Sequence, residues 1–321
     1  MRRTPIHDSD ARVIDRAPPA ARWGGAHIVV PLLVLEAALV VAWSSGFVGT
    51  RFSIDHAPAL LVVFWRCVVV ALVLLPWAVG ALRRAPTAVL LRHVGIGLLA
   101  MTGYLAGVVK GIEYGVPAGL AALIADLLPI GTALLALRLP GHRLGGRGWA
   151  GLLVGLLGVL MVTRDALAWG AAPPWAYGLP LLGMLSLAVA TLWQKHAHSE
   201  ASLGLLPNLW LQCAVSAAAF AWLAGLEGSL MPVASTGFIM SVLWTAVLST
   251  LGGYGLYWVC LRRSSPTRVA SVLYLSPAVT LLWAWAMFDE PLSWLMLLGT
   301  MVSGLGVWLV VRSEQASRRC S

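Results

Sequence analysis

The chain has 321 residues, of which 59% are hydrophobic and 11% charged, and its mean hydropathy is +0.84. A soluble domain carries about 25% charged residues, so this composition excludes a soluble enzyme or binding domain and indicates a membrane protein. The net charge of +9 does not indicate a nucleic-acid partner, because the basic residues form short clusters between apolar runs, as in the cytoplasmic loops of membrane proteins.

The first 27 residues mix arginine with aspartate and contain no long apolar run. We expect residues 1–27 to be a disordered cytoplasmic tail. The apolar run that follows is too long for the core of a signal peptide, and no cleavage site is evident.

Ten apolar runs follow, separated by charged or turn-forming residues. Each is close to the ~20 residues that an α-helix needs to cross a bilayer, and the connections are too short for a soluble domain. The sequence therefore predicts an all-α polytopic membrane protein of ten transmembrane helices. They cover residues 28–50, 59–80, 93–111, 117–138, 147–164, 174–195, 204–226, 237–260, 267–288 and 292–311.

The distribution of Lys and Arg predicts the orientation of these helices. If the N-terminus is cytoplasmic, 18 of the 22 basic residues lie on the cytoplasmic side. Only Arg51, Lys110 and Arg164 lie on the opposite side, and Arg66 lies within a span. This is a strong positive-inside signal, and it predicts that both termini, including the short tail 313–321, are cytoplasmic.

The two halves of the chain end in similar sequences. At an offset of 148 residues, "GWAGLLVGLLGVLMVTR" falls on "WLMLLGTMVSGLGVWLVVR", and Pro129 falls on Pro277. Five helices per repeat is an odd number, so residues 28–164 and 174–312 are expected to have opposite orientations. Such inverted repeats are typical of transporters with a substrate site near the midplane.

The motifs, taken in order, resemble the drug/metabolite transporter superfamily and in particular its ten-helix EamA-type members. The resemblance rests on "WSSGFVGTRF" from Trp43, "FWRCVVVALVLLP" around Arg66, "AALIADLLPIGTALLA", "ASVLYLSPAVTLLWA" and "DEPLSW". It implies a metabolite exporter, often for amino acids, with a central cavity between the halves. The chain departs from the family pattern at His142, where a Glu is usual, and at Asp126, where a small or neutral residue is usual.

Charged residues within spans are candidates for function. Glu36 lies about 12 Å along the first helix at 1.5 Å per residue, in a stripe with Val40, Trp43 and Phe47. It is either a pore-facing acid or a structural partner of Arg66. We predict that Arg66 is structural, because the corresponding residue of the second half is the neutral Gln212.

Three further features are candidates for binding or gating. Lys110, beside Glu113, is either an exposed pair at the membrane surface or part of an exit gate. Asp126 corresponds to Tyr274, and the predicted symmetry places the two face to face as pore-lining residues. Pro129 and Pro277 are expected to bend their helices, although transmembrane helices also tolerate proline without functional consequence.

Deep aromatic residues are the last group of candidates. They are expected to line an aromatic cavity suited to hydrophobic or aromatic solutes, although each could instead face the bilayer. The residues expected to line this cavity are Trp43, Tyr104, Trp193, Trp244, Tyr254, Tyr257 and Trp285.

We therefore predict a secondary transporter of the bacterial inner membrane that exports neutral or aromatic amino acids, or similar small metabolites, by alternating access. Alternatives within the superfamily are an exporter of hydrophobic cationic drugs and an exchanger of nucleotide sugars or phosphate esters. The chain has no Walker motif, no zinc-protease motif and no carboxylate cluster, so we expect no cofactor, no metal and no enzymatic activity. The expected partners are a small-molecule substrate and the lipid bilayer, with the oligomeric state, a monomer included, left open.

Overall fold

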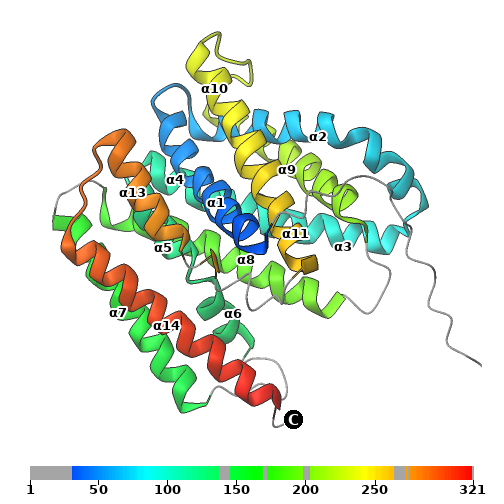
Figure 1. Ribbon diagram of the computed structural model, residues 1–321. Coiled ribbons are helices and arrows are strands. Elements are labelled where there is room, and N and C mark those ends of the chain that lie inside the picture. Colours follow the sequence, from blue (N-terminus) through cyan, green and yellow to red (C-terminus); the bar gives the residue numbers. More distant parts are fainter. Residues whose placement is uncertain are drawn as a thin grey trace, which may run out of the picture. The chain divides into compact units, whose positions relative to one another are not determined.

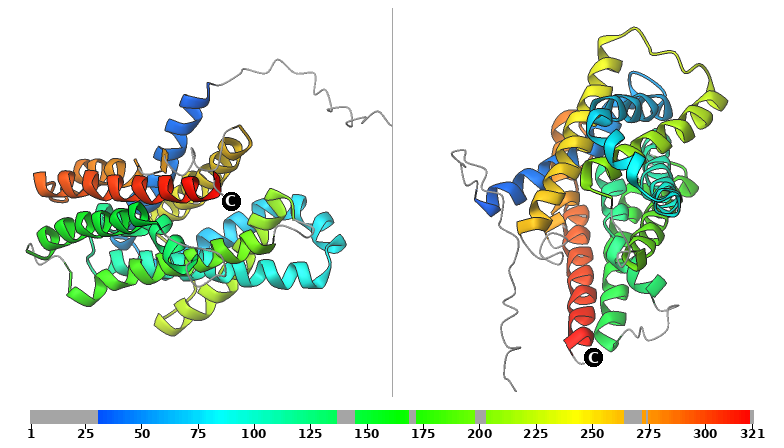
Figure 2. Two further views of the ribbon diagram at one scale, coloured as in Figure 1. Left: turned by 90° about the horizontal axis from the view of Figure 1, so that it is seen from below. Right: turned by 90° about the vertical axis from the view of Figure 1, so that its right-hand side faces the viewer.

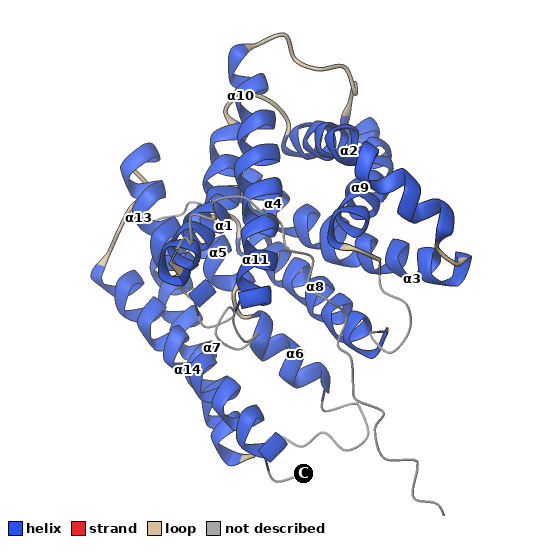
Figure 3. Ribbon diagram, turned by 45° about the vertical axis from the view of Figure 1, so that its right-hand side comes forward, coloured by secondary structure: helices blue, strands red, loops and turns tan. Residues whose placement is uncertain are grey.

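The computed structural model describes residues 31–136, 145–168, 172–197, 203–263, 272–273 and 275–319. Residues Leu32–Ser321 form one compact unit. Every regular element of the described residues is a helix (Figures 1 and 3). The predicted all-α fold is confirmed, whereas the predicted tail 1–27, His142 and Tyr274 lie outside the described residues.

The first half of the chain contains the following helices, in order: α1 (Leu32–Ile54), α2 (Ala59–Arg84), α3 (Thr87–Gly97), η1 (Leu98–Gly103), α4 (Tyr104–Glu113), α5 (Ala118–Ala125), α6 (Leu128–Ala136) and α7 (Gly146–Ala168). The second half contains η2 (Pro174–Tyr177), α8 (Gly178–Ala197), α9 (Leu205–Glu227), α10 (Thr236–Trp244), η3 (Thr245–Tyr254), α11 (Gly255–Arg263), α13 (Ser276–Phe288) and α14 (Trp294–Arg319).

Six helical segments of the described residues are long and apolar enough to cross a membrane. Four shorter apolar helices, which begin at Ala118, Gly146, Ser276 and Trp294, lie within the remaining predicted runs. The structure therefore supports a polytopic membrane protein, while the count of ten crossings and the cytoplasmic position of both termini stay predictions. Helix α14 continues to Arg319, so most of the predicted tail 313–321 is helical.

Two π-helical segments occur at corresponding places in the two halves. The segment η1 covers residues 98–103, and η3 covers 245–254. Shifting η1 by the offset of 148 residues moves it to 246–251, which lies within η3. This correspondence agrees with the predicted duplication. Because π-helical turns often occur at functional sites, it also draws attention to η3 and to the start of α4.

The two prolines do not bend continuous helices, contrary to the prediction. Helix α5 ends at Ala125 and α6 begins at Leu128, so Pro129 is the second residue of a new helix. Pro277 is likewise the second residue of α13. The N–H groups in the first turn of a helix have no acceptor within that helix. Each proline therefore starts a helix without loss of a backbone hydrogen bond.

Helices α7 and α14 pack side by side along glycine residues (Figures 1 and 2). A Cβ atom on Gly306 would fall on the backbone of Gly155, and one on Gly158 would fall on the backbone of Gly299 and Ser303. Small residues at such a contact let two helix backbones approach closely. The repeated glycines that revealed the internal similarity therefore form a helix–helix contact.

Candidate functional site

The most unusual buried charge is Arg66, which lies in α2 and is only 4% exposed. Its Nε donates a hydrogen bond to Thr250 Oγ1 at 2.6 Å, and its Nη2 donates to Ser249 Oγ at 3.2 Å. Both hydroxyls belong to the π-helical segment η3. The irregular backbone of η3 therefore presents two neighbouring hydroxyls, Ser249 and Thr250, to the same guanidinium group.

No carboxylate among the residues that the structure describes forms an ion pair with Arg66. The alternative in which Glu36 pairs with Arg66 is not found among the described residues, because Glu36 is buried within electrostatic reach of Cys260 in α11, as is Arg263. A buried ion normally requires a partner of opposite charge. The two hydroxyls orient the guanidinium group but leave its charge available to an anion.

Arg66 lines a cavity of about 40 Å³. At roughly 10–15 Å³ for each water centre, this is space for about three water molecules, so a metabolite would require the helices to separate. The cavity is lined by Trp43, Gly46, Phe47, Thr50, Arg66, Tyr104, Leu105, Val108, Ser249 and Tyr254.

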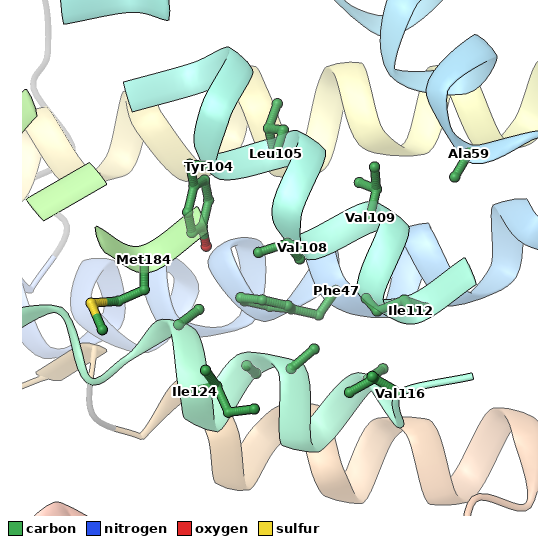
Figure 4. Close-up of a cluster of buried hydrophobic side chains, with 14 of the residues drawn as sticks. Phe47, Ala59, Tyr104, Leu105, Val108, Val109, Ile112, Val116, Ile124 and Met184 are labelled. Carbon is green, nitrogen blue, oxygen red and sulfur yellow. The ribbon is translucent and has the colours of Figure 1, made fainter. Parts of the chain in front are cut away.

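The wall of the cavity is largely aromatic and aliphatic. The ring centroids of Trp43 and Tyr254 lie 5.5 Å apart, and those of Trp43 and Tyr257 lie 6.0 Å apart. Figure 4 shows Phe47 between Val108 and helix α5, with the hydroxyl end of Tyr104 turned toward α5. The site thus combines one cation with an apolar wall.

The structure places the predicted cavity residues in different environments. Trp43, Tyr104 and Tyr254 line the cavity, together with Arg66, to which the sequence had assigned a structural role. Glu36 and Val40 are buried but do not line it.

The remaining predicted aromatic residues do not line this cavity. Trp193 packs on Gly95 but is 41% exposed, and Trp285 is 53% exposed on α13. Trp244 uses its indole nitrogen to donate to Ser45 O at 3.0 Å, which makes it a packing residue between α10 and α1. Tyr257 contacts Trp43 behind the cavity wall.

Sequence reasoning missed the hydroxyl residues Thr50, Ser249 and Thr250. Ser249 and Thr250 are adjacent hydroxyls within an apolar span, a signal that could have been recognised. Their pairing with Arg66 could not be recognised, because the partners are more than 180 residues apart in sequence.

Lys110 connects two helices from different halves of the chain. Its ammonium group pairs with Glu113 on α4 and with Glu227 Oε1 at the end of α9, the latter at 2.8 Å. The partner Glu227 was not expected. Because the contact joins the first half to the second, it fits the gate interpretation better than that of an isolated surface pair.

A second contact between the halves involves Glu290, in the loop between α13 and α14. Its carboxylate accepts from the backbone N–H of Ala118 at 3.1 Å and lies 3.6 Å from Nε of Arg51. The N-cap residue of α5 is Pro117, which provides no side-chain cap, so Glu290 satisfies the first turn of α5 from the other half. Burial raises the pKa of Glu290, while the Ala118 N–H and Arg51 oppose that shift.

The same type of cap occurs at α2. Its N-cap residue is Pro58, and Glu113 accepts from the N–H of Ala59 at 2.9 Å. Anionic side chains are favourable at helix N-termini. Lys110, Glu113 and Glu290 therefore help to hold the ends of several helices together.

The fold and this buried cavity define a polytopic membrane transporter. The model of the EamA-like transporter family matches residues 31–164 and again residues 174–312, and the chain belongs to this family. It is a multi-pass protein of the inner membrane, in agreement with its relatives and its apolar helices.

Curated relatives cover most of the chain. A probable amino-acid metabolite efflux pump of Escherichia coli K12 is 28% identical over 285 residues, which are 87% of this chain and 94% of the relative. A protein of the same description from Salmonella typhimurium is 27% identical, with 86% and 93% covered. An uncharacterized inner membrane transporter of Escherichia coli is 25% identical, with 83% and 85% covered.

A solved crystal structure has the same fold. It superposes with a TM-score of 0.62 over 90% of this chain and 98% of its own, at 18% sequence identity. This likeness supports the arrangement of the helices and carries no information on the substrate.

Proposed function

We propose that this protein is a secondary transporter that exports neutral or aromatic amino acids, or similar carboxylate-bearing metabolites, by alternating access. The observation that carries the proposal is Arg66, a buried cation in a cavity with no carboxylate partner among the described residues. The relatives described as probable amino-acid metabolite efflux pumps support the same substrate class.

The chemistry of the site suits an amino acid. A guanidinium group binds a carboxylate through charge-assisted hydrogen bonds, often two at once. Trp43, Phe47 and Tyr254 offer apolar area to the side chain of the substrate. Their ring faces can also attract an ammonium group, so a zwitterion can satisfy both of its charges.

The small volume of the cavity supports alternating access. A cavity of about 40 Å³ leaves little room for an amino acid, so binding would require the helices to move. The pairs Lys110–Glu227 and Arg51–Glu290 join the two halves at the end expected to face away from the cytoplasm. We propose that these pairs break when that end opens.

The alternatives within the superfamily fit less well. Arg66 would repel a hydrophobic cation from the cavity. A phosphate ester carries up to two charges and would require further cations, yet Arg66 is the only Lys or Arg that lines the cavity among the described residues.

The experiment that tests the proposal uses purified protein in liposomes loaded with one unlabelled amino acid at a time. Exchange of a labelled amino acid for the internal one should be saturable. It should be inhibited by free amino acids more strongly than by the corresponding amines, which lack the carboxylate. Equal inhibition by the amines would contradict the carboxylate site, and absence of exchange for the whole panel would contradict the amino-acid substrate.

A further inference from the structure

Three buried side-chain oxygen atoms where α5 meets α13 have no hydrogen-bond partner among the described residues. They are Oδ2 of Asp126, Oγ of Ser276 and Oγ1 of Thr280. Ser276 and Thr280 are fully buried. Buried polar atoms are nearly always satisfied, so these atoms need an explanation.

Two of these residues, Asp126 and Ser276, are brought together by two helix termini. Asp126 is the C-cap of α5, and Ser276 begins α13, with the Ser276 hydroxyl beside the Asp126 carboxylate. Thr280 follows one helical turn later, on the same face as Ser276. Helix α1 closes the group from another direction, because Ser44 Oγ donates to Ser276 O at 3.2 Å.

The two hydroxyls differ from other buried hydroxyls of this chain. Thr50 and Ser241 donate to the carbonyl oxygens four residues earlier, at 2.8 and 2.7 Å, as is usual in helices. For Thr280 the corresponding acceptor is Ser276 O, which instead accepts from Ser44. The Thr280 hydroxyl is therefore available to another group, and the Ser276 hydroxyl interacts with the Asp126 carboxylate.

Asp126 also has no cationic partner. No Lys, Arg or His of the described residues forms an ion pair with it, and the titratable group facing it is Tyr104 on α4. An ionised carboxylate in an apolar setting is costly without a compensating positive charge. The break after α5 provides a further oxygen, because the residue that would bond the Ala125 carbonyl in a continuous helix is Pro129, which has no N–H.

We propose that Asp126, Ser276 and Thr280 form a binding site for a small cation, either Na⁺ or a proton, that exchanges with the solution. Carboxylate, hydroxyl and carbonyl oxygens are the ligands that hard cations prefer, and broken helices provide such oxygens in other transporters. Cation binding itself does not depend on the proposed amino-acid substrate; only its use as a driving ion rests on the proposed function.

The site is positioned to influence the Arg66 cavity. Tyr104 lines that cavity and lies within electrostatic reach of both Asp126 and Arg66. A cation on Asp126 would change the electrostatic field at Tyr104. Occupancy of the cation site and of the cavity are therefore coupled.

Binding is tested on the purified full-length protein without any substrate. The midpoint of thermal unfolding is measured while NaCl replaces choline chloride at constant ionic strength, and then across a pH series without Na⁺. A Na⁺ site gives a saturable rise of several degrees with NaCl. A proton site gives a rise as the pH falls.

The variants assign the effect to these residues. Asp126→Asn should abolish the response. Ser276→Ala or Thr280→Val should raise the NaCl concentration that gives half of a Na⁺ response at least tenfold. Ser241→Ala, which removes a buried hydroxyl that is already bonded, is the matched control and should respond like the wild type. Without added cation, Asp126→Asn should unfold no earlier than the wild type, because it removes an uncompensated charge.

The proposal is overturned if neither Na⁺ nor pH produces a response that Asp126→Asn removes; the three oxygens then hold only water. Failure of amino-acid exchange with an intact, Asp126-dependent cation response would instead contradict the substrate proposal alone.

Discussion

Replacing Arg66 with Gln is the most direct test of the carboxylate site. Glutamine keeps hydrogen-bonding groups that can reach Ser249 and Thr250, but it removes the positive charge from the cavity. The consequence should therefore concern the substrate rather than the packing of α2 against η3. We expect Arg66→Gln to weaken binding of amino acids and to leave binding of the corresponding amines unchanged or stronger.

The expected loss of amino-acid affinity in Arg66→Gln follows from the environment of the Arg66 charge. Two unit charges ~4 Å apart at an effective dielectric constant of about 20 interact by about 4 kcal/mol, and a hydrogen bond to a charged group contributes about 1.5–3 kcal/mol net. Desolvation of the carboxylate offsets part of the sum, which leaves about 2–4 kcal/mol. At about 1.4 kcal/mol per factor of ten, amino-acid affinity should fall roughly 30- to 700-fold.

The assay is inhibition of exchange in proteoliposomes by matched amino acids and amines. Arg66→Lys should retain part of the preference for the amino acid, because it keeps the charge without the planar, two-pronged geometry. Arg84→Gln, the same substitution at the exposed end of α2, is the control and should behave like the wild type. A correctly folded Arg66→Gln variant that still prefers the amino acid over the amine by the wild-type ratio would refute the reasoning.

Two further predictions concern stability, measured as the midpoint of thermal unfolding in detergent. Gly306→Ala should destabilise the protein by about 1–3 kcal/mol, the usual range for overpacking, because the new methyl group would fall on the backbone of Gly155. Gly304→Ala is the control and should have no such cost, because a Cβ atom there meets nothing within 4 Å. Equal destabilisation by the two substitutions would contradict the close contact. Glu290→Ala should lower the free energy of unfolding by about 0.5–2 kcal/mol, as loss of an N-cap does, because it leaves the Ala118 N–H without its carboxylate. Glu290→Gln keeps an acceptor oxygen and should recover much of that stability. Equal stability of the two variants would show that the cap is not stabilising.

The sequence alone determined the membrane environment, the all-helical fold and the position of nearly every helix. These properties depend on local quantities: the length of an apolar run, the residues that interrupt it and the covalent chemistry of the backbone. The similarity between the ends of the two halves was visible for the same reason. Its glycines were conspicuous because a helix pair in close contact tolerates few other residues.

Local quantities also explain the errors about the aromatic residues. Helical periodicity says which residues share a face of their own helix, but not which way that face is turned in the bundle. An indole is equally suited to a cavity, a helix contact or the bilayer, so Trp43, Trp244 and Trp285 were indistinguishable in sequence. Tertiary packing put one in each of the three environments: cavity, helix contact and exposed surface.

The role of the charged groups was decided only by the tertiary structure. Glu36 and Arg66 were natural partners because opposite charges in neighbouring spans usually pair. The structure instead gives Arg66 two hydroxyls from a π-helical segment and no carboxylate among the described residues, and it places Asp126 beside the Ser276 hydroxyl. The energy of a buried charge depends on groups that are distant in the chain, so the sequence could predict that these residues matter but not what each one binds.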